Sequence, residues 1–135
     1  MELGPCMKII LIASIVALAG CPPTPGPSVT GKLEFTGSTA GYSVVGVKLE
    51  RLPAQVPEVS ETEDIALPTT FPTTFDAGGG LEPVTGDYHL TAWLAAGTGT
   101  QAPAAGAPHA AMDLHFDCND QGCTTPSNLV LTLAP

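Results

Sequence analysis

Hydrophobic and polar residues alternate with a period of two in five stretches of the chain. This pattern is typical of strands that bury one face, because successive side chains point to opposite sides of a sheet. No stretch combines a 3.6-residue apolar repeat with a helix cap, and Thr, Val and Gly are frequent, which agrees with an all-β protein. The five predicted strands cover residues 29–35, 45–50, 89–94, 112–117 and 129–133.

A sixth strand is expected over residues 68–75, where the sequence PTTF occurs twice in succession. A strand would place Phe71 and Phe75 on one face, and Pro72 restricts it to a sheet edge or a bulge. Loops are expected at residues 53–64, which are acidic, and at residues 95–108, which are rich in Ala, Gly and Pro and should be mobile and bury little. Six or seven short antiparallel strands within residues 29–135 predict a single small all-β sandwich.

The chain begins with a segment typical of an export signal. Lys8 precedes an uncharged apolar run of ten residues, 9–18. This length suits the hydrophobic region of a signal peptide and is too short for a membrane-spanning helix of about 20 residues. A buried helix of the domain is the alternative. We therefore expect residues 1–20 to be a signal peptide, with translation starting at Met1 or Met7.

The end of the apolar run, Leu18-Ala19-Gly20-Cys21, is similar at every position to the lipobox of bacterial lipoproteins. The resemblance implies cleavage between Gly20 and Cys21 and a diacylglycerol on the Cys21 thiol. A secretory signal cleaved near Ala19 is the alternative. More than one acyl chain would give stable anchoring.

The resemblance to lipoproteins also implies a location, which is the cell envelope. Pro22 rather than Asp follows Cys21, and in a Gram-negative cell this favours the outer membrane over the inner one. Residues 21–28, CPPTPGPS, are expected to form a semi-extended Pro-rich tether between the lipid and the domain.

Residues 81–92, LEPVTGDYHLTA, resemble the motif L-x-P-x-x-G-x-Y-x-L/V-x-A of carboxypeptidase-regulatory-like and transthyretin-like domains. In that motif Pro83 and Gly86 would form a turn, and Tyr88 would pack its ring at the corner and direct its hydroxyl to backbone. Residues 29–33 and 45–52 look like the first two strands. The resemblance implies a seven-stranded accessory, binding or stalk module without catalytic residues. After Trp93 the chain departs from the family, because residues 95–100, AAGTGT, stand where many relatives have an Asp/Asn-rich turn, and this puts ligand chemistry there in doubt.

The net charge and the absence of several catalytic motifs narrow the range of functions that the sequence allows. Four Lys and Arg residues against 13 Asp and Glu residues give a net charge of -9. This argues against nucleic acid, which needs a basic surface. The chain has no G-x-S-x-G or H-E-x-x-H motif and no phosphate-binding Gly loop with a Lys, and residues 78–80, GGG, suit a turn. We expect a non-enzymatic protein without a cofactor beyond the lipid on Cys21. Its expected partners are the membrane and an unidentified envelope or surface protein.

Cys118 and Cys123 are the two cysteines that the signal peptide and the lipobox leave over. In an exported protein such a pair predicts a disulfide, which here would close the turn 119–122. A metal or redox pair is the alternative, but the spacing is not C-x-x-C. Residues 117–122, DCNDQG, also match the start of a calcium loop. Gln in the fifth position, and Asn where the bidentate Glu belongs, favour a plain turn.

The remaining candidate ligand contacts are His89, Trp93, His115 and Asp117. By strand parity Asp113, His115 and Asp117 share one face, where a zinc or copper ion could bind. We favour the interpretation that this is a polar face exposed to solvent, and we assign no metal site. Trp93 could stack on a sugar, or it could be a packing residue. The alternative function is therefore a ligand-binding module for carbohydrate or a divalent cation.

Overall fold

The computed structural model describes residues 24–54, 56–67, 69–97, 104–124, 126 and 128–134. The predicted signal peptide and the lipobox, Leu18 to Cys21, lie outside the described residues. No helix within the described ranges is long and apolar enough to span a membrane. The strands are β1 (Ser28–Glu34), β2 (Val44–Arg51), β3 (Ser60–Ala66), β4 (Thr73–Gly78), β5 (Gly86–Ala95), β6 (His109–Phe116), β7 (Cys118–Asn119), β8 (Gly122–Cys123) and β9 (Leu129–Thr132).

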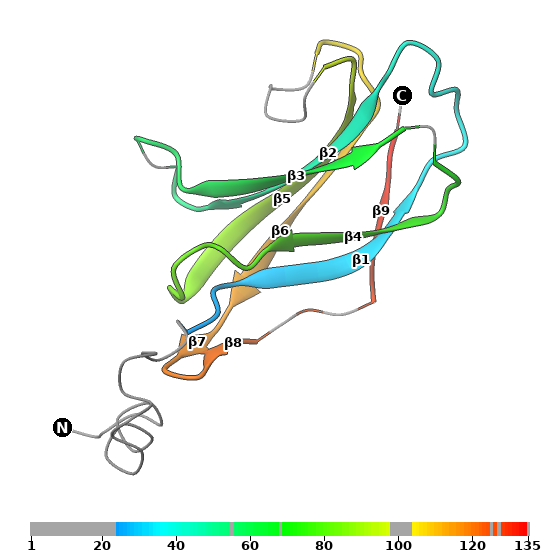
Figure 1. Ribbon diagram of the computed structural model, residues 1–135. Helices are drawn as coiled ribbons and strands as arrows, with labels where there is room; N and C mark the ends of the chain where they lie inside the picture. The colour runs from blue at the N-terminus through cyan, green and yellow to red at the C-terminus, as the bar shows by residue number, and fades with distance from the viewer. Residues whose placement is uncertain are drawn as a thin grey trace, which may run out of the picture.

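Two sheets pack face to face, which confirms the predicted β-sandwich (Figure 1). One sheet has the strand order β4-β1-β9 and the other has the order β3-β2-β5-β6, while β7 and β8 form a separate hairpin at one end. The neighbours are antiparallel except β1 and β9, which run parallel. The expectation of purely antiparallel strands is wrong for this pair, because the chain crosses from β6 to the other sheet before it enters β9.

The core lies between the sheets and is filled by the residues that the alternation predicts to face inward. Each of the five predicted strands is present, and each contributes buried side chains to one continuous cluster. Burying a Val, Leu or Phe side chain fully is worth about 1.5–3 kcal/mol, so this cluster is the main source of stability. Its fully or almost fully buried members include Val29, Leu33, Val45, Val47, Leu49, Leu90, Ala92, Leu94, Phe116, Leu131 and Leu133.

The prediction of a loop at residues 53–64 is wrong at its end, because β3 begins at Ser60. This strand pairs only with β2 inside its own sheet and therefore forms an edge. Its carboxylates stay at the surface, so the strand lacks the apolar alternation by which the other strands are recognised. Glu61 and Glu63 instead accept hydrogen bonds from the backbone N–H groups of Gly80 and Asp76, at 2.7 and 3.1 Å.

The strand expected over the PTTF repeat is shorter than predicted. It begins at Thr73 as β4 and is an edge strand, as the proline indicated. Phe75 lies inside the core, whereas Phe71 precedes the strand and packs edge-on against Phe35, with 5.8 Å between the ring centroids. The two Phe side chains therefore both support the core but do not share a strand face.

The expected loop at residues 95–108 also buries more than predicted. Ala107 is 3% exposed, and the carbonyl of Pro108 accepts a hydrogen bond of 3.0 Å from the N–H of Leu94. The hydrogen bonding of β5 thus extends to the residue that precedes β6. Residues 98–103 of this loop lie outside the described residues.

Candidate functional site

Tyr88 forms a corner at the start of β5. Its side chain is fully buried, and its hydroxyl donates a hydrogen bond of 2.7 Å to the carbonyl oxygen of Val84. The ring meets Phe116 edge-to-face, with 5.1 Å between the centroids. Burial raises the pKa of the Tyr88 hydroxyl, so the group stays a neutral donor. The contacts expected of this tyrosine from the motif are confirmed.

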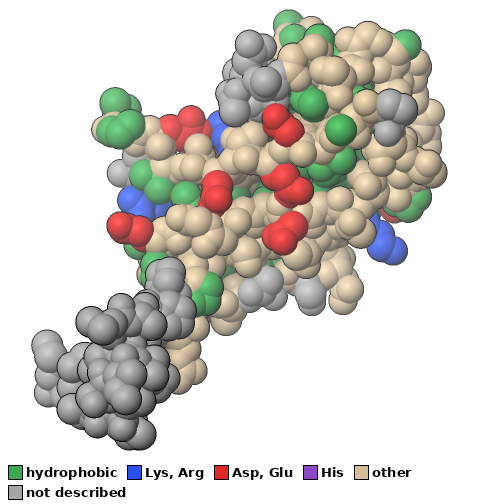
Figure 2. All heavy atoms as spheres, viewed as in Figure 1, with side chains coloured by type: hydrophobic (Ala, Val, Ile, Leu, Met, Phe, Trp, Pro, Cys, Tyr) green, Lys and Arg blue, Asp and Glu red, His purple; other side chains and the backbone are tan. Residues whose placement is uncertain are grey.

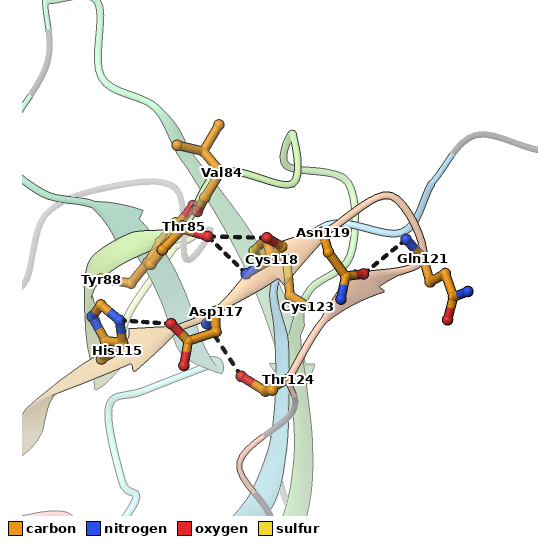
Figure 3. Close-up of a disulfide and its surroundings, with 10 residues drawn as sticks. All are labelled: Val84, Thr85, Tyr88, His115, Asp117, Cys118, Asn119, Gln121, Cys123 and Thr124. Carbon is orange, nitrogen blue, oxygen red and sulfur yellow. Dashed lines mark hydrogen bonds and ion pairs between the residues drawn. A yellow bond between two sulfur atoms is a disulfide. The ribbon is translucent and has the colours of Figure 1, made fainter. Parts of the chain in front are cut away.

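The disulfide between Cys118 and Cys123 is present and closes the β7–β8 hairpin (Figure 3). The Asn119 side chain accepts a hydrogen bond of 2.8 Å from the N–H of Gln121, an Asx-type contact that fixes the turn. The hydroxyl of Thr85 accepts from the Cys118 N–H at 2.8 Å and lies 3.1 Å from the Cys118 carbonyl oxygen. The hairpin is therefore joined to the turn that precedes the Tyr88 corner.

Histidine and aspartate side chains pair across the exposed face of β5 and β6. His89 Nδ1 lies 2.6 Å from Asp113 Oδ1, and His115 Nδ1 lies 2.8 Å from Asp87 Oδ1. His115 Nε2 is also 3.2 Å from Asp117 Oδ1. These contacts follow from the strand register, in which Asp87 opposes His115 and His89 opposes Asp113.

The two carboxylates beside His115 favour its charged form. Hydrogen bonds to Asp87 and then to Asp117 raise the pKa of the His115 imidazole above its ordinary value of 6.5. The structure thus brings together two of the candidate contacts, His115 and Asp117, and places His89 beside a different partner.

Trp93, another of the candidate ligand contacts, is buried. It is 2% exposed, and its indole Nε1 is buried with no hydrogen-bond partner among the described residues. In the sheet Trp93 is paired with Gly46 of β2 and His109 of β6, and by strand parity its side chain leaves the sheet on the face opposite to Ala92 and Leu94. Because a buried ring offers no face to a sugar, the stacking platform is wrong and packing is the correct interpretation.

Within the described ranges, no three or more His, Cys, Asp and Glu side chains form a group that could hold a metal ion. On the His–Asp face the potential ligand atoms meet only in pairs among these residues, and His115 is the histidine that contacts two carboxylates, those of Asp87 and Asp117. The calcium-loop pattern also includes Asp117, but there the Asn119 side chain binds the backbone of its own turn.

Acidic residues along the β3–β4 seam form a feature that the sequence interpretation missed. Glu61, Glu63 and Asp76 gather where the edge strands of the two sheets meet, and Figure 2 shows acidic side chains spread over this face. Partial burial raises the pKa of the Glu63 carboxyl. The alternation of Glu and Thr in Glu61-Thr62-Glu63 was the available signal for a strand here.

A groove with a volume of about 580 Å³ lies beside the seam, against Lys32, Glu63, Phe75 and Val130. Its lining mixes one cation, carboxylates and apolar atoms, so it selects no single class of ligand. No protein-family model, no curated protein and no solved structure matches the chain.

Proposed function

We propose that this protein is an exported lipoprotein that is held at the membrane by an acylated Cys21 and presents a non-catalytic β-sandwich to a protein partner in the cell envelope. The observation that carries the proposal is the sequence Leu18-Ala19-Gly20-Cys21 directly after a ten-residue apolar run. The disulfide of the β7–β8 hairpin supports export, because disulfides persist in oxidising compartments outside the cytoplasm.

The distribution of charge supports a display role. Among the described residues no charged side chain is buried, and the acidic groups are carried on strand faces and loops at the surface. Catalytic sites generally hold titratable groups in a shielded cavity, where burial and neighbouring charges shift their pKa values strongly. An acidic, exposed surface suits contact with a partner that carries complementary charge.

Metabolic labelling with a fatty-acid analogue, in a bacterium that processes lipoproteins, tests the anchor. We expect the wild-type protein to be labelled and to sediment with membranes. Cys21→Ser removes the thiol that carries the lipid and should abolish the labelling. Cys6→Ser is the matched control, since Cys6 lies in the predicted signal peptide, and it should label like the wild type. Equal labelling of wild type and Cys21→Ser would overturn the proposal.

The second candidate function is binding of a divalent transition-metal ion, and one contact favours it. His115 Nε2 and Asp117 Oδ1 are 3.2 Å apart. Two ligands that bind one tetrahedral zinc ion at about 2.0–2.1 Å are separated by about 3.3 Å. Asp87 holds the other ring nitrogen of His115, which is how carboxylates orient metal-binding histidines.

Zinc titration followed by calorimetry tests this second candidate. With two protein ligands, we expect weak binding that His115→Gln and Asp117→Asn each abolish. His109→Gln should leave the binding unchanged, because His109 contacts the backbone oxygen of Ala107 rather than a carboxylate. Binding that survives both ligand substitutions would exclude this site.

A further inference from the structure

The described part of the chain after Cys21, which begins at Thr24, is packed against the domain. The Thr24 hydroxyl donates a hydrogen bond of 3.2 Å to the carbonyl oxygen of Asp120, in the turn of the disulfide hairpin. Pro25 lies on the same hairpin, since a methyl group added to Gly122 would be 3.2 Å from Pro25 Cγ. The first two described residues therefore rest on β7–β8.

The next two residues are held still more firmly. Gly26 and Pro27 are buried. Gly26 runs so close to the carbonyl of Leu81 that any side chain at this position would collide with it. The carbonyl of Pro27 accepts a hydrogen bond of 2.9 Å from the N–H of Gly79. The described part of the expected tether, Thr24–Ser28, is thus packed against the domain. Its last residue, Ser28, is the first residue of β1.

This packing limits how far Cys21 can lie from the domain. Three residue steps separate Cys21 from Thr24, and an extended chain spans at most about 3.6 Å per residue. The Cys21 Cα therefore lies within about 11 Å of the Thr24 Cα, whatever path the chain takes. The β7–β8 hairpin, which Thr24 contacts through Asp120, lies at one end of the sandwich (Figure 1).

We infer that this end of the sandwich, the base, formed by residues 79–84 and the β7–β8 hairpin, faces the membrane and lies close to the lipid headgroups. The inference rests on the proposed acylation of Cys21. The opposite end, with the loop 36–43, points away from the bilayer and is the part presented to a partner (Figure 1). The segment between the lipid and the domain is then a short connection that fixes the orientation of the domain, and not a long flexible linker.

The chemistry of the base indicates which lipid surface it fits. Glu82 and Asp120 are exposed, Val84 is 38% exposed, and residues 79–84 and 117–124 contain no Lys or Arg. A basic residue near the surface would add about 1 kcal/mol of attraction to an anionic membrane, and here that attraction is missing. The base therefore suits a zwitterionic headgroup layer, and the acyl chains alone hold it there.

Fluorescence measured on the full acylated protein in phosphatidylcholine vesicles tests the inference. Gln121→Cys places a label on the base, and Thr36→Cys places one at the opposite end; both positions are exposed. With an energy acceptor on the lipid headgroups, we expect transfer from position 121 to exceed transfer from position 36 several-fold. Inserting a flexible spacer of about twenty Gly and Ser residues before Pro23 should reduce the difference without changing flotation with the vesicles.

The outcomes separate the two proposals. Flotation with equal transfer from both labels, or stronger transfer from position 36, would overturn the orientation and leave the anchor intact. Failure of the protein to float with vesicles would overturn the anchor and the orientation together. If the difference in energy transfer between the two labels persists with the long spacer, the base binds lipid by itself. This result would contradict the claim that the short connection to Cys21 orients the domain. Adding phosphatidylserine to the vesicles should not increase the transfer.

Discussion

Replacing Tyr88 by Phe isolates the hydrogen bond at the corner of β5 from the packing of the ring. The substitution keeps the buried ring and its edge-to-face contact with Phe116, and removes only the 2.7 Å bond to the Val84 carbonyl. A neutral hydrogen bond contributes about 0.5–1.5 kcal/mol to stability. Val84 is partly exposed, so water can reach its carbonyl after the substitution. We therefore expect a loss of about 1 kcal/mol in the free energy of unfolding.

Urea unfolding followed by circular dichroism measures this loss as a lower midpoint with an unchanged slope. Tyr88→Ala, which also removes the ring, should cost about 3–5 kcal/mol. Tyr42→Phe is the matched control, because Tyr42 is only partly buried and its hydroxyl has no hydrogen bond within the described structure, so the midpoint should not change. An unchanged midpoint for Tyr88→Phe would refute the corner bond. A loss as large as that of Tyr88→Ala would refute the assignment of most of the stability to ring packing.

Three further predictions concern the hairpin, the sheet and the His–Asp face. Removing the disulfide with Cys118→Ser and Cys123→Ser, which opens a loop of sequence separation 5, should cost about 2 kcal/mol in urea unfolding, and an unchanged midpoint would contradict this. Gly31→Ala should lower the free energy of unfolding by about 1–3 kcal/mol, because the new methyl group would lie 2.5 Å from a backbone oxygen of β9. A melting temperature equal to that of the wild type would show that β1 and β9 can move apart without cost. NMR titration should give His115 a pKa above 6.5, and Asp87→Asn should lower it, whereas an unchanged value would exclude the pair. Because folding raises this pKa, the stabilisation is present below the ordinary value and is lost as the pH rises through the folded one.

The strands that bury one face were predictable from the sequence because their apolar residues repeat with a period of two. Val45, Val47 and Leu49 are fully buried, and Lys48 between them is partly exposed. β3 lacked this signal because it is an edge strand whose carboxylates bind backbone groups of β4 and of the loop that follows it. Such contacts depend on which edges meet in space, and a single sequence does not contain that information.

The candidate contacts show the same limit. Strand parity correctly placed His115 and Asp117 on one face, where their side chains meet. Parity does not reveal whether the outer face of a sheet is covered, and at Trp93 it is, since this residue is only 2% exposed. In the same way, the composition of residues 21–28 indicated a semi-extended tether between the lipid and the domain. It could not reveal that Gly26 fits against Leu81, because that contact joins distant segments.

Mass spectrometry of the protein extracted from membranes tests the central claim most directly. Our account predicts that the N-terminal peptide of the mature chain begins at Cys21 and carries a diacylglyceryl group on its sulfur, with the preceding twenty residues absent. A mature chain that begins at another residue, or an unmodified Cys21 thiol on the membrane-associated protein, would contradict it.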